Sequence, residues 1–205
     1  MSDSKRKLAA IVFTDIVGFT KLSAKDQSKA SQLLLEQRQI LQPIVNQYGG
    51  RWIKEIGDGL LLTFDTIVDA VNCCIKIQKE SKKLEHLDLR IGVHQGEILI
   101  EGDDVIGDDV NIASRIEPFS SVGGIAISNK INDAITRESE FETKYLGKPK
   151  LKGVSQKVEV YCITSHNLPE TEISKVSAKL ESEESNNFKW NIFSVTGALL
   201  TLIGL

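Results

Sequence analysis

The chain has 205 residues, 41% of them hydrophobic and 26% charged, which suits one well-buried domain with a tail and is short for two full domains. Its formal net charge of -3 leaves no basic excess to neutralise a polyphosphate backbone, so the composition disfavours a nucleic-acid partner. The 3 cysteines include the neighbours Cys73 and Cys74, which rarely close a disulfide, and this usage suits a reducing cytosol.

Hydrophobic periodicity predicts short strands and amphipathic helices. In chain order the first half has a strand over 8–13, a helix over 26–48, strands over 51–56 and 60–64, a helix over 66–84, and strands over 87–93 and 98–100 around a turn at Gln95-Gly96. The second half has a helix that begins after Gly107, a strand over 125–127 with Ser128 after it as a helix N-cap, and a last apolar run over 157–163. Hairpins interrupt the regular strand-helix alternation of a doubly wound sheet. The pattern therefore favours an α+β fold with helices on one face of a largely antiparallel sheet.

A change of composition marks the end of the predicted domain. Residues 165–187 are rich in Ser, Glu, Lys and Asn and predict a solvated linker, so we expect the domain to occupy 1–164. Residues 188–205 form an apolar tail, shorter than the roughly 20 residues that cross a bilayer. The tail predicts a truncated membrane helix that tethers a cytoplasmic domain at the cytoplasmic face. The alternative is a helix that docks on its own domain or on a second copy.

Two acids stand where the predicted strands end. Asp15 follows the strand over 8–13, and Asp58 lies at the tip of a hairpin, within Gly57-Asp58-Gly59. Two carboxylates that share divalent cations are what phosphoryl transfer requires, because the cations offset the charge of the nucleophile and of the leaving group. On spacing alone an alternative stays open, with Asp15 as a helix cap and Asp58 as a turn residue.

Four sequence blocks, in order, resemble those of the class III nucleotidyl cyclases. They are FTDIVGFTKLS from Phe13, KEIGDGLLLTF from Lys54, RIGVHQGE from Arg90 and GDDVNIASRIE from Gly107. The resemblance covers about residues 5–163. It implies a ferredoxin-like βαββαβ core and a head-to-tail homodimer with sites at the interface, where one subunit holds the metals and the other reads the base. The implied activity is that of a bacterial adenylate cyclase, which forms cyclic AMP and pyrophosphate from ATP.

The resemblance also implies the metal site. Asp15 and Asp58 match the two metal-binding aspartates, and the carbonyl of Ile16 matches an additional ligand, for two Mg²⁺ or Mn²⁺ ions per site. One ion would activate the ribose 3′-hydroxyl for in-line attack on the α-phosphorus, and the other would hold the triphosphate and stabilise the departing pyrophosphate.

Lys54 and Asp104 match the two positions that read the purine. An ammonium can only donate, so Lys54 suits the unprotonated N1 of adenine and opposes the N1–H of guanine. Guanylate cyclases carry an acid at the Lys54 position. A carboxylate at Asp104 can accept from the adenine 6-amino group, whereas a bicarbonate-responsive subgroup tends to have threonine there. Taken alone, either residue is also explained as an exposed surface charge.

Three further residues match substrate contacts of the family. Asn111 and Arg115 stand four apart on one helix face and match the residues that orient the ribose and stabilise the transition state. Arg115 could instead pair with a neighbouring surface acid. Lys152 matches a lysine that contacts the β- and γ-phosphates, and the lysines around it leave its register open.

Other function classes are weighed against this one. A catalytically poor nucleotide-binding scaffold has no need for the intact set Asp15, Asp58, Asn111 and Arg115. A two-metal polymerase would need a basic groove, and a P-loop ATPase would need a GxxxxGK[ST] loop; the sequence has neither. His94 has no second histidine at ligand spacing, which favours a structural function over metal binding.

Overall fold

The computed structural model describes residues 5–172 of the chain. Its elements are β1 (Lys5–Ile16), α1 (Phe19–Lys25), α2 (Gln27–Gln47), β2 (Arg51–Ile56), β3 (Gly59–Phe64), α3 (Ile67–Ser81), β4 (Leu89–Glu101), β5 (Asp104–Ile106), α4 (Asp108–Ile116), a 3₁₀ turn η1 (Glu117–Phe119), β6 (Ile125–Ser128), α5 (Asn129–Ile135), β7 (Thr143–Gly147) and β8 (Val160–Ile163). The sequence did not predict α1, β5 or β7. Helix α1 buries no residue, and β5 is only 3 residues long. Neither element therefore carries an apolar stripe that periodicity can detect.

The strands form one sheet in the order β2-β3-β1-β4-β6-β8-β7, and β5 pairs with β4. Among the described residues β4 and β6 run parallel, and the other pairings are antiparallel. The segment β1-α2-β2-β3-α3-β4, with sheet order β2-β3-β1-β4, is a ferredoxin-like βαββαβ core. The predicted α+β class is confirmed.

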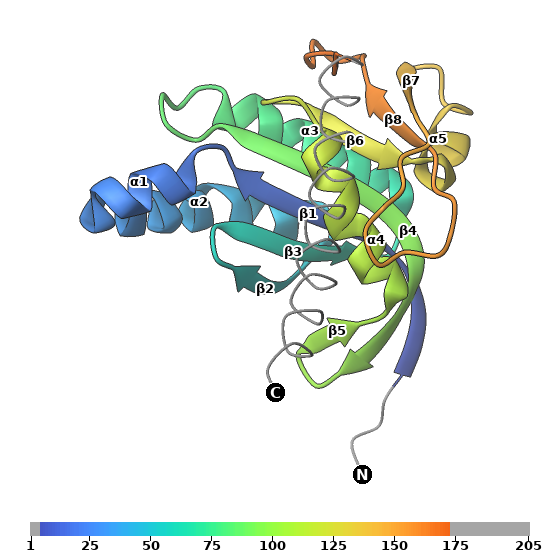
Figure 1. Ribbon diagram of the computed structural model, residues 1–205, viewed down its shortest axis with the longest axis horizontal. Coiled ribbons are helices and arrows are strands. Elements are labelled where there is room, and N and C mark those ends of the chain that lie inside the picture. Colours follow the sequence, from blue (N-terminus) through green and yellow to red (C-terminus); the bar gives the residue numbers. More distant parts are fainter. Residues whose placement is uncertain (1–4, 173–205) are drawn as a thin grey trace, which may run out of the picture. The chain divides into compact units, whose positions relative to one another are not determined.

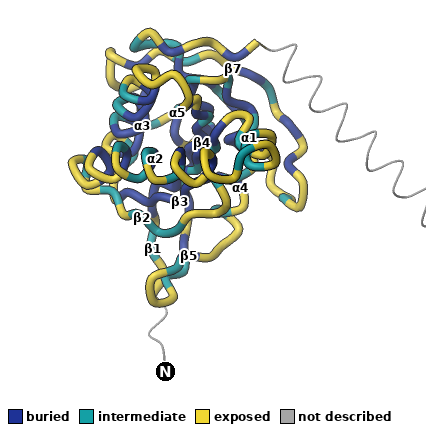
Figure 2. Tube along the Cα trace, turned by 90° about the vertical axis from the view of Figure 1, so that its left-hand side faces the viewer, coloured by how far each residue is buried: buried dark blue, intermediate teal, exposed yellow. Residues whose placement is uncertain are grey.

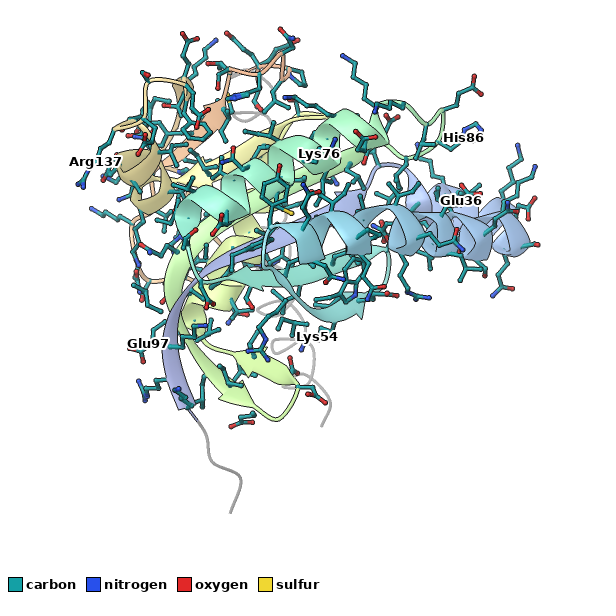
Figure 3. The ribbon with its side chains drawn as sticks, turned by 180° about the vertical axis from the view of Figure 1, so that it is seen from behind. Glu36, Lys54, Lys76, His86, Glu97 and Arg137 are labelled. Atoms are coloured by element: carbon teal, nitrogen blue, oxygen red, sulfur yellow. The ribbon has the colours of Figure 1, made fainter. Side chains whose placement is uncertain are left out.

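Helices cover both faces of the sheet rather than the single face that the sequence pattern predicted. Side chains alternate along a strand, so Ala10 and Val12 of β1 pack in one core with α2 and α3, whereas Ala9 and Ile11 pack in a second core with Ala113 of α4. Figure 1 shows α4 in front of the sheet and α2 and α3 behind it, and Figure 3 shows the same layers from the opposite side.

The predicted turn at Gln95-Gly96 is wrong, because both residues lie within strand β4. Residues 89–101 form one continuous strand, which pairs with β1 from Ile16↔Leu89 to Lys5↔Ile100. Gly96 is needed for packing rather than for a turn, because a Cβ atom there would lie 1.9 Å from the Asp109 side chain on α4. Sequence reasoning took this glycine as a chain reversal, since glycine is common in both settings.

The compact unit extends past the predicted boundary at 164 and includes Thr171. Ser121 Oγ donates a hydrogen bond to the carbonyl of Pro169 at 3.1 Å, and Ser121 N donates to Thr171 Oγ1 at 3.1 Å. The rest of the predicted linker and the apolar tail over 188–205 lie outside the described residues. Within residues 5–172 no helix combines the length and apolar character required to cross a membrane. Membrane attachment through the tail therefore stays a prediction.

The larger core lies between the sheet and the helices α2, α3 and α5. Figure 2 shows buried residues concentrated in the central strands and exposed residues on the outer surfaces of the helices. Of the strands at its centre, β1 carries Asp15 and Ile16 at its end, and β3 begins directly after Asp58. Packing of this core therefore positions the two predicted metal-binding acids.

We expect Leu62→Ala, in the centre of β3, to lower the free energy of unfolding by about 2–5 kcal/mol. The Leu62 side chain is fully buried (0% exposed), so the substitution removes transfer energy and leaves a cavity. Leu35→Ala is the matched control, because Leu35 on α2 is 52% exposed and should change stability by less than about 0.5 kcal/mol. Urea titrations followed by circular dichroism measure both, and equal losses would contradict the placement of the core.

Candidate functional site

The two predicted metal-binding acids meet at one end of the sheet. Asp15 is the second-last residue of β1, and Asp58 lies in the turn between β2 and β3. Because β3 pairs with β1 through Thr14↔Leu60, the turn lies beside the end of β1. The backbone N–H of Ile16 donates to Asp58 Oδ2 at 3.0 Å. This hydrogen bond ties the hairpin tip to the strand that carries Asp15.

Three features hold the Asp58 turn in place. Gly57 has φ 65°, a left-handed conformation that glycine adopts at little cost. Gly59 lets the turn approach β1, because a Cβ atom there would lie 2.7 Å from the carbonyl oxygen of Thr14. The buried side chain of Gln37 on α2 donates to the Asp58 carbonyl at 3.2 Å. The tip is therefore preorganised by a strand and a helix together.

Two half-buried carboxylates lie close together at this end of the sheet and repel each other. Burial raises the pKa of Asp58, and the neighbouring charge of Asp15 raises it further. Arg90 of β4 stands directly opposite Asp15 in the β1–β4 ladder and donates from Nη2 to Asp15 Oδ2 at 2.5 Å. Sequence reasoning missed Arg90 as a member of the site. Once β1 and β4 are paired in this register, it lies opposite Asp15, the predicted metal ligand.

The residues at this end fit a magnesium-type site. Asp15, Asp58 and the Ile16 carbonyl offer hard oxygen donors, and a divalent cation would relieve the repulsion that raises the pKa of Asp58. No cluster of three or more His, Cys, Asp or Glu side chains within residues 5–172 could hold a metal ion. Mg²⁺ commonly binds through one or two carboxylates together with substrate phosphates and waters, so a two-carboxylate site suits a metal that arrives with its substrate.

The two predicted purine-reading residues also meet. Lys54 Nζ lies 2.6 Å from Asp104 Oδ2, and the side chains are 40% and 46% exposed. Figure 3 shows Lys54 on β2 beside the β4–β5 hairpin. The pKa of Asp104 is lowered, first by the hydrogen bond from Lys54 and then by that from the backbone N–H of Val105. The pair is thus a donor and an acceptor side by side on an accessible surface.

A β-bulge turns Lys54 toward this surface. The register of β2 against β3 shifts between Trp52, opposite Leu62, and Lys54, opposite Leu61. Leu62 belongs to the core under α2 and α3, whereas Leu61 belongs to the core under α4. Without the extra residue, simple alternation would place Lys54 on the same face as Trp52.

Helix α4 carries Asn111 and Arg115, both exposed and four residues apart. Its first turn is attached to β4 through Asp109, which accepts from Glu97 N at 2.8 Å and pairs with His94 Nε2 at 2.9 Å. A carboxylate only accepts, so Nε2 carries the proton. Burial lowers the pKa of His94, which favours the neutral ring. His94 thus anchors the helix that presents Asn111 and Arg115.

The structure does not bring every predicted residue together. Lys152 is exposed in the loop between β7 and β8, and no ion pair among residues 5–172 includes it. In this part of the chain no hydrogen bond joins the Asp15–Asp58 pair to the Lys54–Asp104 pair. A cavity of about 570 Å³ at the C-terminal end of α3 contains none of the predicted site residues. Within residues 5–172 the two pairs are therefore separate groups, and the acid pair is half-buried.

Comparison with known proteins matches residues 2–165 to the family described as the adenylate and guanylate cyclase catalytic domain. A putative adenylate cyclase 3 of Rhizobium meliloti is 32% identical over 165 residues, which cover 77% of this chain and 28% of that protein. The chain therefore spans little more than a quarter of that curated relative.

Two solved structures are similar over most of the chain. A structure titled adenylate/guanylate cyclase/hydrolase, from Silicibacter pomeroyi, has a TM-score of 0.72 and 30% identity, and covers 82% of this chain and 100% of its own. The adenylyl cyclase CyaB of P. aeruginosa has a TM-score of 0.72 and 28% identity, and covers 80% of this chain and 96% of its own.

The strained acid pair predicts a pH-dependent stability effect of Asp58→Asn in metal-free protein. Because the folded state raises the pKa of Asp58, ionised Asp58 destabilises the fold above the ordinary pKa of an aspartate, about 3.9. We expect Asp58→Asn to be more stable than the parent at neutral pH in EDTA. The advantage should shrink as the pH falls and should vanish below the ordinary aspartate pKa, where the Asp58 carboxyl is protonated in both the folded and the unfolded parent.

Urea titrations between neutral and mildly acidic pH measure this difference. Asp133→Asn, an exposed acid on α5, is the matched control and should not show the pH-dependent advantage. A difference between Asp58→Asn and the parent that stays constant with pH, or a loss of stability at neutral pH, would show that Asp58 is not strained in the folded protein.

Proposed function

The chain belongs to the adenylate and guanylate cyclase catalytic-domain family, and we propose that it is an adenylate cyclase that converts ATP to 3′,5′-cyclic AMP and pyrophosphate. The observation that carries the choice of ATP is the Lys54–Asp104 pair, a donor and an acceptor 2.6 Å apart on an accessible surface. The named adenylate cyclase relatives support the same choice.

The base preference follows from hydrogen-bond chemistry. Adenine presents an acceptor at N1 beside a donor at its 6-amino group, and Lys54 and Asp104 supply the complementary donor and acceptor. Guanine presents the reverse pattern, an N1–H donor beside a carbonyl, and would leave both side chains facing groups of their own kind. A site built to bond one polar edge discriminates strongly against the opposite one, because the unpaired groups lose their solvation without compensation.

At the other pair, Asp15, Asp58 and the carbonyl of Ile16 would hold two divalent cations, Mg²⁺ or Mn²⁺. When bound, such cations lower the pKa of the ribose 3′-hydroxyl and offset the charge of the triphosphate and of the departing pyrophosphate. The protein supplies geometry here: Gln37 and the Ile16 N–H fix Asp58 at the end of β1. The attacking group is the substrate's own hydroxyl, so no protein nucleophile is required.

Arg115 would stabilise the charge that develops on the α-phosphate, and Asn111 would orient the ribose. Both project from α4, whose first turn is attached to β4 by Asp109, so their backbone positions are fixed. Lys152, in its exposed loop, would contact the β- and γ-phosphates. The loop position suits a contact that forms when substrate arrives.

A second copy of the chain would complete each site. No hydrogen bond or ion pair within residues 5–172 joins the acid pair to the purine-reading pair. A head-to-tail homodimer would place the Asp15–Asp58 pair of one subunit opposite Lys54, Asp104 and α4 of the other. Two equivalent sites follow from the symmetry, and the monomer should be nearly inactive.

Purified protein should form cyclic AMP from ATP with Mg²⁺ or Mn²⁺ and little cyclic GMP from GTP. Asp58→Ala should lower the rate at least about 100-fold, because it removes a metal ligand. Lys54→Glu combined with Asp104→Asn exchanges the donor and acceptor pattern and should shift the ratio of GTP to ATP use by at least about tenfold. Product formation measured by chromatography tests both expectations.

The outcomes separate the parts of the proposal. Cyclic GMP as the main product of the parent chain would overturn the assignment of ATP as the substrate and would still support cyclase activity. Activity that survives Asp58→Ala would overturn the metal assignment. No product from either nucleotide in a dimeric sample would favour a nucleotide-binding scaffold instead.

The shared site predicts complementation between two inactive variants. In a mixture of Asp58→Ala and Arg115→Ala chains, half of the dimers are mixed and each mixed dimer has one intact site, so activity should recover to about a quarter of the parent level. Subunit exchange followed by a cyclic AMP assay measures the recovery. If the mixture is no more active than the separate variants, Asp58 and Arg115 do not act from different subunits.

A further inference from the structure

A cavity of about 570 Å³ lies at the C-terminal end of α3, and none of the proposed site residues lines it. Its walls come from the last turn of α3 with residues 82–83, the start of β4 at 87–89, the turn at 122–123 before β6, and the segment 166–169 after β8. In Figure 3, His86 marks the loop that joins this end of α3 to β4. Pockets for small molecules commonly have volumes of about 300–1,000 Å³, so the cavity has the size of such a site.

The cavity combines apolar walls with a buried hydroxyl that lacks a partner. Leu87, Leu89 and Leu168 line it and are 2%, 0% and 8% exposed. Ser81 also lines it and is 2% exposed, and its Oγ has no hydrogen-bond partner within residues 5–172. Most buried polar groups in proteins have a partner, because an unpaired one is unfavourable. A ligand with a polar atom in the cavity would supply the partner that Ser81 lacks.

The walls are held in place without a ligand. Gln78 Nε2 donates to the carbonyls of Leu89 and Gly124 at 3.2 and 2.7 Å, which joins α3 to β4 and to the chain before β6. The segment after β8 is held by the ring of His166, whose centroid lies 5.6 Å from that of Phe141. A preformed cavity requires little ordering when a ligand binds, which favours affinity.

Lysines give the cavity a surplus of positive charge. Lys79, Lys82 and Lys83 line it, and among the described residues Asp88 is the acid on its walls. Lys83 pairs with Glu80 at 2.7 and 2.8 Å, whereas no ion pair within residues 5–172 includes Lys79 or Lys82. Asp88 and the partial negative charge at the end of a helix, about half an elementary charge, do not cancel both lysines. The surplus favours an anionic ligand.

We propose that this cavity is a binding site for a small organic anion, a carboxylate or sulfonate on an apolar body. The negative group would lie by Lys79, Lys82 and the Ser81 hydroxyl, and the apolar body would lie against the leucines of the walls. An inorganic anion would leave those leucines uncovered, and a neutral apolar molecule would leave the lysines and Ser81 without a partner. The cavity is separate from the proposed nucleotide site, so the inference does not rest on the proposed function.

The probe for this site is anilinonaphthalene sulfonate, an aromatic anion whose fluorescence rises in apolar surroundings. The full chain should bind the probe, and octanoate should displace it. Octanamide, the neutral counterpart of octanoate, should displace it at least about tenfold less well, because it lacks the charge that the lysines attract. Inorganic phosphate lacks the apolar body and should not displace the probe at the concentrations at which octanoate does. ATP with Mn²⁺ should not displace it either.

Substitution of the two lysines tests the position of the site. Lys79→Gln combined with Lys82→Gln should weaken probe binding by about tenfold, because both attracting charges are lost. Lys21→Gln combined with Lys25→Gln is the matched control: these lysines on α1 are also exposed, the net charge changes equally, and α1 does not line the cavity. The control should leave probe affinity unchanged in the same fluorescence titration.

Ser81→Ala distinguishes a ligand contact from a structural one. The substitution should weaken probe binding by about threefold or more, because the hydrogen bond to the bound anion is lost. The melting temperature of the ligand-free variant should stay the same or rise, because the hydroxyl that is removed is buried without a partner. A fall in melting temperature would overturn the assignment of this hydroxyl to a ligand.

The other outcomes are equally decisive. Equal probe affinity in the parent and in both double variants would overturn the site, because binding elsewhere on the chain does not depend on Lys79 and Lys82. Displacement by octanamide or phosphate as effective as that by octanoate would overturn the class of ligand. Displacement by ATP would assign the probe to the nucleotide site instead. The expected binding pattern in a chain that makes no cyclic nucleotide would support the site and overturn only the proposed function.

Discussion

The antiparallel pairing of β1 with β4 is the constraint on which the rest of the structure depends. It runs without interruption from Ile16↔Leu89 to Lys5↔Ile100 and joins the two halves of the βαββαβ core. Because side chains alternate along a strand, a shift by one residue would move Asp15 to the opposite face and separate it from Arg90. The register of one ladder therefore sets both the hydrophobic core and the charges at the end of the sheet that carries Asp15 and Arg90.

Strand β4 shows how a short motif serves two layers. In RIGVHQGE, Ile91 and Val93 face the core under α3, whereas the alternate residues face α4. On that second face Gly92 and Gly96 leave space for Glu117 and Asp109, since a Cβ atom at either position would lie too close to them. Small residues on one face and branched residues on the other let a single strand carry helices on both sides. The same alternation places Arg90 on the sheet face that carries Asp15.

Local patterns predicted the main elements, and long-range geometry decided the rest. Spacing alone left Asp15 and Asp58 open to explanation as a helix cap and a turn residue, and only the resemblance of their sequence blocks to those of the class III cyclases singled them out. The mistaken turn at Gly96 and the missed Arg90 share one cause, since both depend on which segment packs across β4. The bulge that orients Lys54 is equally invisible in the linear order of residues, because it exists only relative to β3. Sequence identified the candidates, and register determined which of them meet.

Lys54 and Asp104 form an ion pair with each other. Under the proposed function, adenine must therefore replace their direct hydrogen bond rather than bind to unpaired charges. Exchange lowers affinity, because part of the binding energy is used to break the resting pair. It raises selectivity, because a ligand that breaks the pair without supplying matching hydrogen bonds leaves partly buried charges unpaired. Under the proposed function, a base with the wrong edge would incur that cost at Lys54 and Asp104.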